Sequence, residues 1–232
     1  MSSRKHTCGL ELSHQLGQTP AVQLLVRHCD RLVRRLSHWR DGQLARRALQ
    51  QAGEPNLVLD LPCGAGRFWP LLTEQPNRVV LAADSSAEIL SLVKASHTDE
   101  VLARVRTFQT SPFAIDLPDN AVDSIFSMRL LHHVADREGR LAILREFQRV
   151  SRDSLIVSLW VDGNFKAWRR RHLARRRAEL EGRQERRKRF VVDRATIEAE
   201  FGEAGFDIVG HHDALPGYAM RRIYVLYKRT SA

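Results

Sequence analysis

The feature that most constrains the fold is a short apolar run that stops at an acid and enters a glycine-rich turn. Residues 56–61 read NLVLDL, and Pro-Cys-Gly-Ala-Gly follows at once. This run predicts a buried strand that ends at a tight turn, and Phe68 is expected to open the next helix. Glycines let a ligand approach the backbone, and the start of a helix offers unpaired N–H groups. We therefore expect a ligand site at this turn.

The order of strand, turn and helix repeats along the chain. The expected strands are 56–61, 78–83, 105–109, 124–128, 154–160, 206–211 and 223–228. The expected helices are two between 20 and 52, separated at Asp41-Gly42, and then 68–73, one containing 89–93, 137–150 and 196–204. Alternation of this kind predicts an α/β fold with a doubly wound, mainly parallel sheet covered on both faces.

Length and composition set the outer limits of the interpretation. A chain of 232 residues is long enough for one domain with a full core. We divide the expected domain into N-terminal helices at 1–52, a ligand-binding core at 53–160, a basic helical insertion at 161–195, and a C-terminal helix and strands at 196–232. The apolar runs are too short to cross a bilayer and the N-terminus is polar, so a cytoplasmic location is expected.

The cysteines and the charges point to a reducing compartment and to one basic surface. Cys8, Cys29 and Cys63 are widely spaced and odd in number, which favours neither disulfides nor a metal site. The net charge of +10 is concentrated in residues 165–194, where thirteen Lys or Arg stand against four acids. A single basic segment predicts a local surface for phosphates, acidic sugars, anionic lipid or RNA.

Two acids at strand ends suggest the kind of ligand. Asp60 ends the first strand and Asp84 ends the second, 24 positions later. In nucleotide-binding sheets an acid at about 20 residues from the glycine loop accepts hydrogen bonds from ribose hydroxyls. The spacing therefore predicts an adenosine-type site, although glycine turns after strands also occur for purely steric reasons.

Five stretches occur in the order and spacing of one family. They are VLDLPCGAGRF at 58–68, the strand ending in DSS at 84–86, LPDNAVDSIFSMRLLHHV at 117–134, LREFQRVSRDSLIVSLW at 144–160, and EAGFDIV at 203–209. The chain resembles the class I S-adenosylmethionine-dependent methyltransferases, in the branch of small single-domain enzymes. The resemblance covers residues 50–160 well and 196–228 loosely, and it implies a seven-stranded Rossmann-like sheet with S-adenosylmethionine as cofactor.

The resemblance also implies which residues contact the cofactor. These are Asp60, Pro62, Gly64, Gly66, Arg67, Asp84, Ser85, Ser111, Phe113 and Met128. Pro62 replaces the first glycine of the loop in many members, and Ser111 stands where an Asp commonly binds the adenine amine. A dehydrogenase is disfavoured because the loop lacks a full G-x-G-x-x-G.

Candidates for catalysis follow the fourth strand. His132 or His133 could remove a proton from an acceptor hydroxyl, or could instead pack beneath the turn and cap the next helix. Arg129 could bind an anionic group of the substrate, or pair with Asp136 or Glu138.

The basic insertion is expected to cover the acceptor entrance. Candidate substrate-binding residues are Trp160, Trp168, Arg169 and Arg170. The insertion fits a lid for phosphate, a helix on an anionic membrane surface, or a solvated helix. We expect O-methylation of a small-molecule, phosphorylated or glycolipid acceptor, such as a lipopolysaccharide-type lipid. The alternatives are an RNA methyltransferase, because a basic strip binds RNA backbones, and a non-catalytic interaction or regulatory protein that keeps the cofactor site.

Overall fold

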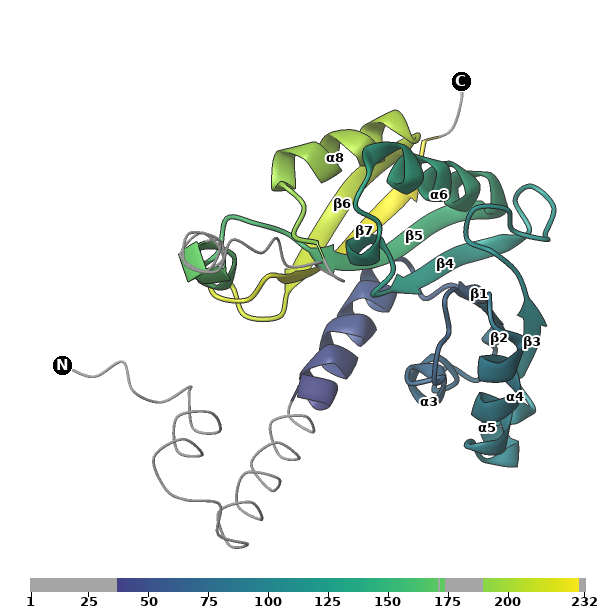
Figure 1. Ribbon diagram of the computed structural model, residues 1–232. Coiled ribbons are helices and arrows are strands. Elements are labelled where there is room, and N and C mark those ends of the chain that lie inside the picture. The colour runs from purple at the N-terminus through teal and green to yellow at the C-terminus, as the bar shows by residue number, and fades with distance from the viewer. Residues whose placement is uncertain (1–36, 171, 174–189, 230–232) are drawn as a thin grey trace, which may run out of the picture. The chain divides into compact units, whose positions relative to one another are not determined.

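The computed structural model describes residues 37–170, 172–173 and 190–229 (Figure 1). The chain divides into two compact units, Met1–Gln43 and Leu44–Ala232, and the sheet lies in the second. The strands are β1 (Leu57–Asp60), β2 (Val79–Asp84), β3 (Val105–Gln109), β4 (Val122–Met128), β5 (Ser151–Trp160), β6 (Phe206–Asp213) and β7 (Arg221–Lys228). The helices are α3 (Trp69–Leu72), α4 (Ala87–Ala95), α5 (Asp99–Leu102), the 3-10 turn η1 (Leu131–His133), α6 (Arg137–Val150) and α8 (Arg194–Glu203).

The seven strands form one sheet in the order β3-β2-β1-β4-β5-β7-β6. All neighbouring pairs are parallel except those made by β7, which is antiparallel to both β5 and β6. The chain reverses its direction of travel across the sheet between β3 and β4, so β1 and β4 are neighbours in the middle. Ligands of such sheets bind at the carboxyl ends of the strands near this reversal. The prediction of a mainly parallel, seven-stranded α/β fold is confirmed.

Apolar side chains fill both faces of the sheet. One cluster joins α6 and α8 to the sheet through residues such as Phe147 and Phe201. The other joins α3 and α4, together with Leu44 to Ala52, to the opposite face. Figure 1 shows α6 and α8 on one side of the strands and α3 and α4 on the other. The inner strands β1, β4, β5 and β7 are therefore largely buried on both faces, which explains their apolar sequences, whereas the outer strands β3 and β6 are more exposed.

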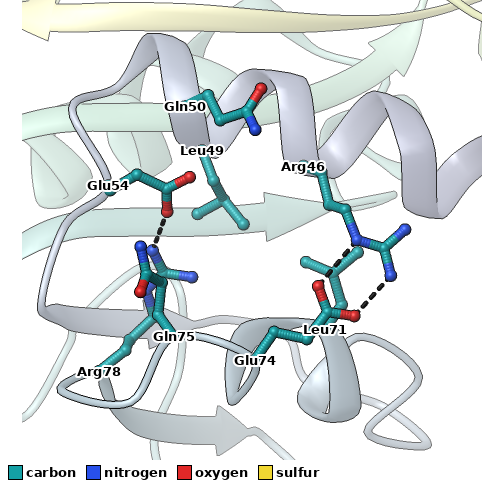
Figure 2. A pocket seen from close by; sticks show the side chains of 8 residues that line it. All are labelled: Arg46, Leu49, Gln50, Glu54, Leu71, Glu74, Gln75 and Arg78. Carbon is teal, nitrogen blue, oxygen red and sulfur yellow. Dashed lines mark hydrogen bonds and ion pairs between the residues drawn. The ribbon is translucent and has the colours of Figure 1, made fainter.

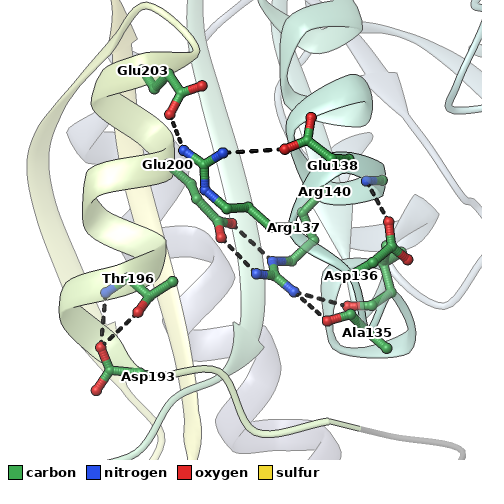
Figure 3. A network of polar contacts seen from close by, with 11 residues as sticks. Ala135, Asp136, Arg137, Glu138, Arg140, Asp193, Thr196, Glu200 and Glu203 are labelled. Atoms are coloured by element: carbon green, nitrogen blue, oxygen red, sulfur yellow. Dashed lines mark hydrogen bonds and ion pairs between the residues drawn. The ribbon is translucent and has the colours of Figure 1, made fainter.

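A buried ion pair fastens α6 to α8 (Figure 3). Arg140 donates from Nε and Nη2 to the two carboxylate oxygens of Glu200, at 2.8 and 2.6 Å. The same guanidinium donates to the carbonyl oxygens of Val134 and Ala135. Asp136 caps α6 by accepting from the Gly139 N–H. These bonds hold the short segment between η1 and α6. They thereby also fix the end of η1, the turn that carries His132 and His133, which we call the histidine turn.

Some local predictions were wrong. Residues 37–51 are helical, so Asp41 and Gly42 lie within helical backbone rather than between two helices. Glycine is tolerated in a helix at a cost of about 1 kcal/mol, and here the surrounding helix formers outweigh it. The short elements α5 and η1 were not expected. Helix is present in the insertion at 165–170 and 172–173, whereas its residues 174–189 and the expected helix before 37 lie outside the described residues.

Within the described ranges, no helix has the length and apolar character needed to span a bilayer.

Candidate functional site

The loop after β1 contains two glycines with different surroundings: there is free space beside Gly64, whereas Gly66 is enclosed by side chains. Gly64 has a φ of +52°, and no atom lies within 4 Å of the place where a Cβ would stand. Gly66 has a φ of +63°, but there a Cβ would lie 2.7 to 2.8 Å from atoms of Val93, His97 and Trp69. Gly66 therefore serves the packing of the loop, and its contact with a cofactor stays a prediction. Gly64 is the position where a ligand could approach the backbone.

Asp84 ties the glycine loop to the end of β2. Its Oδ2 accepts a hydrogen bond from the Gly64 N–H at 3.1 Å, and its Oδ1 accepts one from the Ser86 N–H at 3.1 Å. The side chain is only 6% exposed. An ionised carboxylate can accept about four hydrogen bonds, so Asp84 can still accept bonds from two hydroxyls. Ser85, beside it, is exposed, and its carbonyl accepts from the Gln109 side chain.

Asp60 lies buried at the end of β1 and is oriented by an indole. Its Oδ2 accepts a hydrogen bond from Trp69 Nε1 at 3.1 Å. Burial raises the pKa of Asp60 to about 8, the bond from Trp69 opposes the rise, and the neighbouring charge of Asp84 adds to it. Sequence reasoning identified Asp60 but missed Trp69, since no sequence pattern links a strand-end acid to an aromatic residue nine positions later.

The loop after β3 lies beside the end of β2. The Thr110 N–H donates to the Asp84 carbonyl at 3.1 Å. The Ser111 hydroxyl accepts from the Phe113 N–H at 3.2 Å, so it stabilises its own turn, and the Phe113 ring is half exposed. This places Ser111 and Phe113 at the same edge as Asp84, where the adenine end of the cofactor was expected.

The remaining residues predicted to contact the cofactor are Pro62 and Arg67 in the glycine loop and Met128 at the end of β4. Pro62 follows a cis peptide bond and is partly exposed. Arg67 lies over the Phe68 ring, with its Cζ 5.2 Å from the ring centre, and that ring meets Phe126 of β4 edge to face. Met128 ends β4 and is buried in the same cluster as the loop residue Cys63. No cofactor contact is established for these residues, which stay predictions.

The edge of β4 and β5 carries a stack of rings. His132 is 3% exposed and lies flat against Trp160, with ring centres 5.0 Å apart and 5° between the planes. His133 is exposed, and its ring centre is 4.4 Å from that of His132. Arg170, from the insertion, places its Cζ 5.2 Å from the centre of the Trp160 ring. These four side chains are neighbours in pairs, His133 with His132, His132 with Trp160, and Trp160 with Arg170, and we call the group the histidine–tryptophan stack.

Other predicted residues lie apart from this stack. The Trp168 ring is 60% exposed and stacks on His172, and Arg169 is exposed as well. Arg129 directly follows β4 with a φ of +67°, which is uncommon for a residue with a side chain, and its N–H donates to the Ser158 hydroxyl at 2.9 Å. Thus Trp160 and Arg170 join the histidines, whereas Trp168 and Arg169 belong to a separate surface.

A pocket of about 180 Å³ lies at the opposite edge of the sheet, where β1 and β2 begin (Figure 2). Arg46 pairs there with Glu74, and Arg78 pairs with Glu54. Each drawn charge thus has a partner within the protein, and the Arg78 side chain is almost fully buried. The pocket is stabilised by its own ion pairs and lies away from the carboxyl ends of the strands, so we assign it no ligand.

The carboxyl edge fits S-adenosylmethionine in its charge and its open space. That cofactor carries positive charge at the sulfur and the amino group, and its ribose has two hydroxyls. Asp60 offers a buried carboxyl at the end of β1, and Asp84 offers one with remaining acceptor capacity at the end of β2. Gly64 leaves the backbone between them uncovered. These are the residues that would hold the methionine part and the ribose.

Comparisons with known proteins agree with this geometry. Residues 58–154 match the family model described as a methyltransferase domain. A magnesium protoporphyrin IX methyltransferase from Synechocystis PCC 6803, solved with bound SAH, is 18% identical, with a TM-score of 0.66 over 91% of this chain and 89% of that chain. The S-adenosylmethionine-dependent methyltransferase SibL is 19% identical, with a TM-score of 0.65 over 91% of this chain and 60% of that chain.

A third similar structure is a SAM-dependent methyltransferase from Methanosarcina mazei, 14% identical, with a TM-score of 0.60 over 75% of this chain and 93% of that chain. At these identities the likeness concerns the fold. No curated protein matches the chain in sequence. The matched domain, the order of the strands and the paired acids at their carboxyl ends agree: residues 58–154 form a methyltransferase domain, the sheet has the fold of S-adenosylmethionine-dependent methyltransferases, and the site fits S-adenosylmethionine as cofactor.

Proposed function

We propose that this methyltransferase methylates a hydroxyl oxygen of an anionic acceptor, namely a phosphorylated small molecule or the head group of a glycolipid. The observation that carries the proposal is the histidine–tryptophan stack, which combines an exposed imidazole with a guanidinium at the edge next to the cofactor site. The cofactor supplies an electrophilic methyl group, so the protein has to align an oxygen with it and accept the proton.

The position of the stack relative to the cofactor edge supports this assignment. β4 pairs with β1 on one side and with β5 on the other, with Asp60 opposite Phe126 and Met128 opposite Ser158. Residues that follow β4 and end β5 therefore lie beside the end of β1. An acceptor resting on the stack would lie next to the methionine part of the cofactor.

Each member of the stack has a distinct proposed role. His133 is exposed and would accept the proton of the acceptor hydroxyl. His132 is buried flat against Trp160, so we assign it the role of a positioning residue that holds the turn. The guanidinium of Arg170 lies on the Trp160 ring and offers forked donors to a phosphate or carboxylate.

The acceptor class is tested with cofactor carrying a labelled methyl group. The purified chain is incubated with polar and lipid extracts, each with and without prior phosphatase treatment. We expect label in fractions retained by an anion exchanger and lost after phosphatase. An O-methyl ether survives mild alkali and releases its label with hydriodic acid. Label confined to RNA, to protein or to uncharged molecules would refute the proposal.

Two variants then test the assigned roles. Arg170→Ala is expected to raise KM for the acceptor about tenfold or more with a smaller effect on kcat. Arg145→Ala, which removes an exposed arginine of α6 outside the stack, serves as the matched control. His133→Gln is expected to lower kcat about a hundredfold and to remove the acidic limb of the pH profile. An unchanged pH profile in His133→Gln would remove His133 from the mechanism while leaving the acceptor class intact.

A further inference from the structure

We propose that the enzyme docks on an anionic lipid surface through an aromatic and basic patch outside the catalytic edge. The patch consists of residues from the start of the insertion and from the loop between β6 and β7. Its members are Phe165, Lys166, Trp168, Arg169, Leu173, Leu215 and Tyr218. The inference concerns where the enzyme works and does not depend on the identity of the acceptor.

The patch exposes more apolar surface than isolated surface residues would. The exposed fractions are 48% for Phe165, 60% for Trp168, 46% for Leu173 and 51% for Leu215. The rings of Phe165 and Trp168 are neighbours, with their centres 5.8 Å apart. Scattered apolar side chains on a surface need no explanation, but exposed rings that lie against one another, with further exposed apolar residues on the same two segments, indicate a site of interaction.

The two segments that form the patch are fastened to each other. The Phe165 N–H donates to the Gly217 carbonyl at 3.0 Å, and the Lys166 N–H donates to the Tyr218 carbonyl at 3.1 Å. The ring of Phe165 stacks on that of Tyr218, with 15° between the planes. The exposed rings are thus held in place by backbone hydrogen bonds, so little conformational freedom is lost when a partner covers them.

Basic side chains accompany the apolar ones in the helical segment of the patch. The segment 164–173 reads NFKAWRRRHL and the loop 214–219 reads ALPGYA, so neither contains Asp or Glu. Lys166 places its ammonium 5.1 Å from the centre of the Tyr218 ring, and Arg169 is exposed. Aromatic side chains prefer the level of lipid head groups, and basic side chains are attracted to anionic lipids. This combination matches a helix that lies in a membrane interface.

The aliphatic members favour lipid over nucleic acid. Single-stranded RNA is bound by aromatic faces on which bases stack and by cations along the backbone. Leu173 and Leu215 can do neither, yet both are about half exposed in the patch. In a bilayer interface the same side chains would leave water together with Phe165 and Trp168, which is favourable in proportion to the apolar area covered.

The test uses the full chain and sedimentation with vesicles. Vesicles of phosphatidylcholine mixed with phosphatidylglycerol are compared with vesicles of phosphatidylcholine alone, at low and high salt. We expect binding to the anionic vesicles that weakens at high salt. The double variant Lys166→Gln/Arg169→Gln is expected to bind them about thirtyfold more weakly, since each basic residue near the surface contributes about a factor of five.

The apolar part of the patch is tested with Trp168→Ser/Leu215→Ser, which should weaken binding about tenfold or more. The matched control is Leu92→Ser, because Leu92 is 65% exposed on α4, outside the patch, and its loss should leave binding unchanged. Lipids brominated in their acyl chains should quench tryptophan emission in the original chain and less in Trp168→Phe.

Several results would overturn the proposal. These are equal binding to neutral and anionic vesicles, absence of vesicle binding, and equal loss of binding in Leu92→Ser. Binding of RNA that depends on Trp168 and Leu215, without vesicle binding, would assign the patch to nucleic acid. A dimer that dissociates in Trp168→Ser/Leu215→Ser, again without vesicle binding, would assign it to a second copy of the chain.

Discussion

Replacing Asp60 by Asn should stabilise the cofactor-free protein, and the gain should grow with pH. Burial raises the pKa of this carboxyl to about 8 in the folded chain, whereas an Asp in an unfolded chain has a pKa of about 3.9. Between these values the unfolded side chain is ionised and the folded one holds its proton. The folded state then binds more protons than the unfolded state, so stability falls as the pH rises through this window.

The size of the gain in unfolding free energy follows from the pH range between the unfolded and the folded pKa of Asp60. Each pH unit above the unfolded pKa costs the Asp60 protein about 1.4 kcal/mol of unfolding free energy, until the folded group also ionises. Asn cannot ionise, and its carbonyl oxygen can still accept from Trp69 Nε1. The variant should therefore gain about 1.5 kcal/mol at pH 5 and at most about 4 kcal/mol at pH 7, with no further rise above about pH 8.

The assay is urea unfolding of both proteins without cofactor, at a series of pH values from about 5 to 8, with cofactor affinity measured by calorimetry in parallel. The variant should bind S-adenosylmethionine more weakly, because the cationic cofactor favours the ionised form of Asp60, a form that Asn cannot adopt. A difference in stability that stays constant over this range would show that Asp60 is already ionised in the folded protein. The assigned effect of burial would then be refuted.

Two further predictions concern positions that hold the fold together. Glu200→Ala leaves the buried guanidinium of Arg140 without its carboxylate and should cost about 3–5 kcal/mol in urea unfolding. Glu203→Ala removes two exposed pairs, with Arg137 and Arg145, and should cost about 1 kcal/mol or less; similar losses in the two variants would refute the assigned burial. Gly66→Ala should lower the melting temperature far more than Gly64→Ala, because both positions have positive φ but only Gly66 is enclosed; equal effects would show that backbone strain alone decides.

The inner strands could be predicted because they are largely buried on both faces and therefore appear as runs of apolar residues. The order of the strands could not be read from such runs, since every central strand looks alike. The short elements α5 and η1 have too few residues to show a helical period, and the helix through Gly42 shows that one glycine does not by itself end a helix.

At the candidate site, the acids at strand ends were predictable, but their partners were not. Trp69 is the first residue of α3, and the loop after β1 brings it close enough to donate a hydrogen bond to Asp60 at the end of that strand. Arg169 and Arg170 are neighbours in sequence and had received the same role. A helix turns by about 100° per residue, so only Arg170 lies on Trp160 while Arg169 is exposed on another face. Which of two adjacent arginines lies on the Trp160 ring depends on helix rotation, which the sequence pattern left open.

The two ends of the basic insertion, near Val161 and Val192, lie side by side at the end of β5. Val161 pairs with Val192, and the Phe190 N–H donates to the His132 carbonyl at 2.7 Å. Because its two ends are already closed against each other, a doubling of the length between them would cost only about 0.6 kcal/mol of closure entropy. The same closure connects that segment directly to the histidine turn. The architecture therefore allows the insertion to be exchanged or lengthened through evolution while the domain that carries the glycine loop stays unaltered.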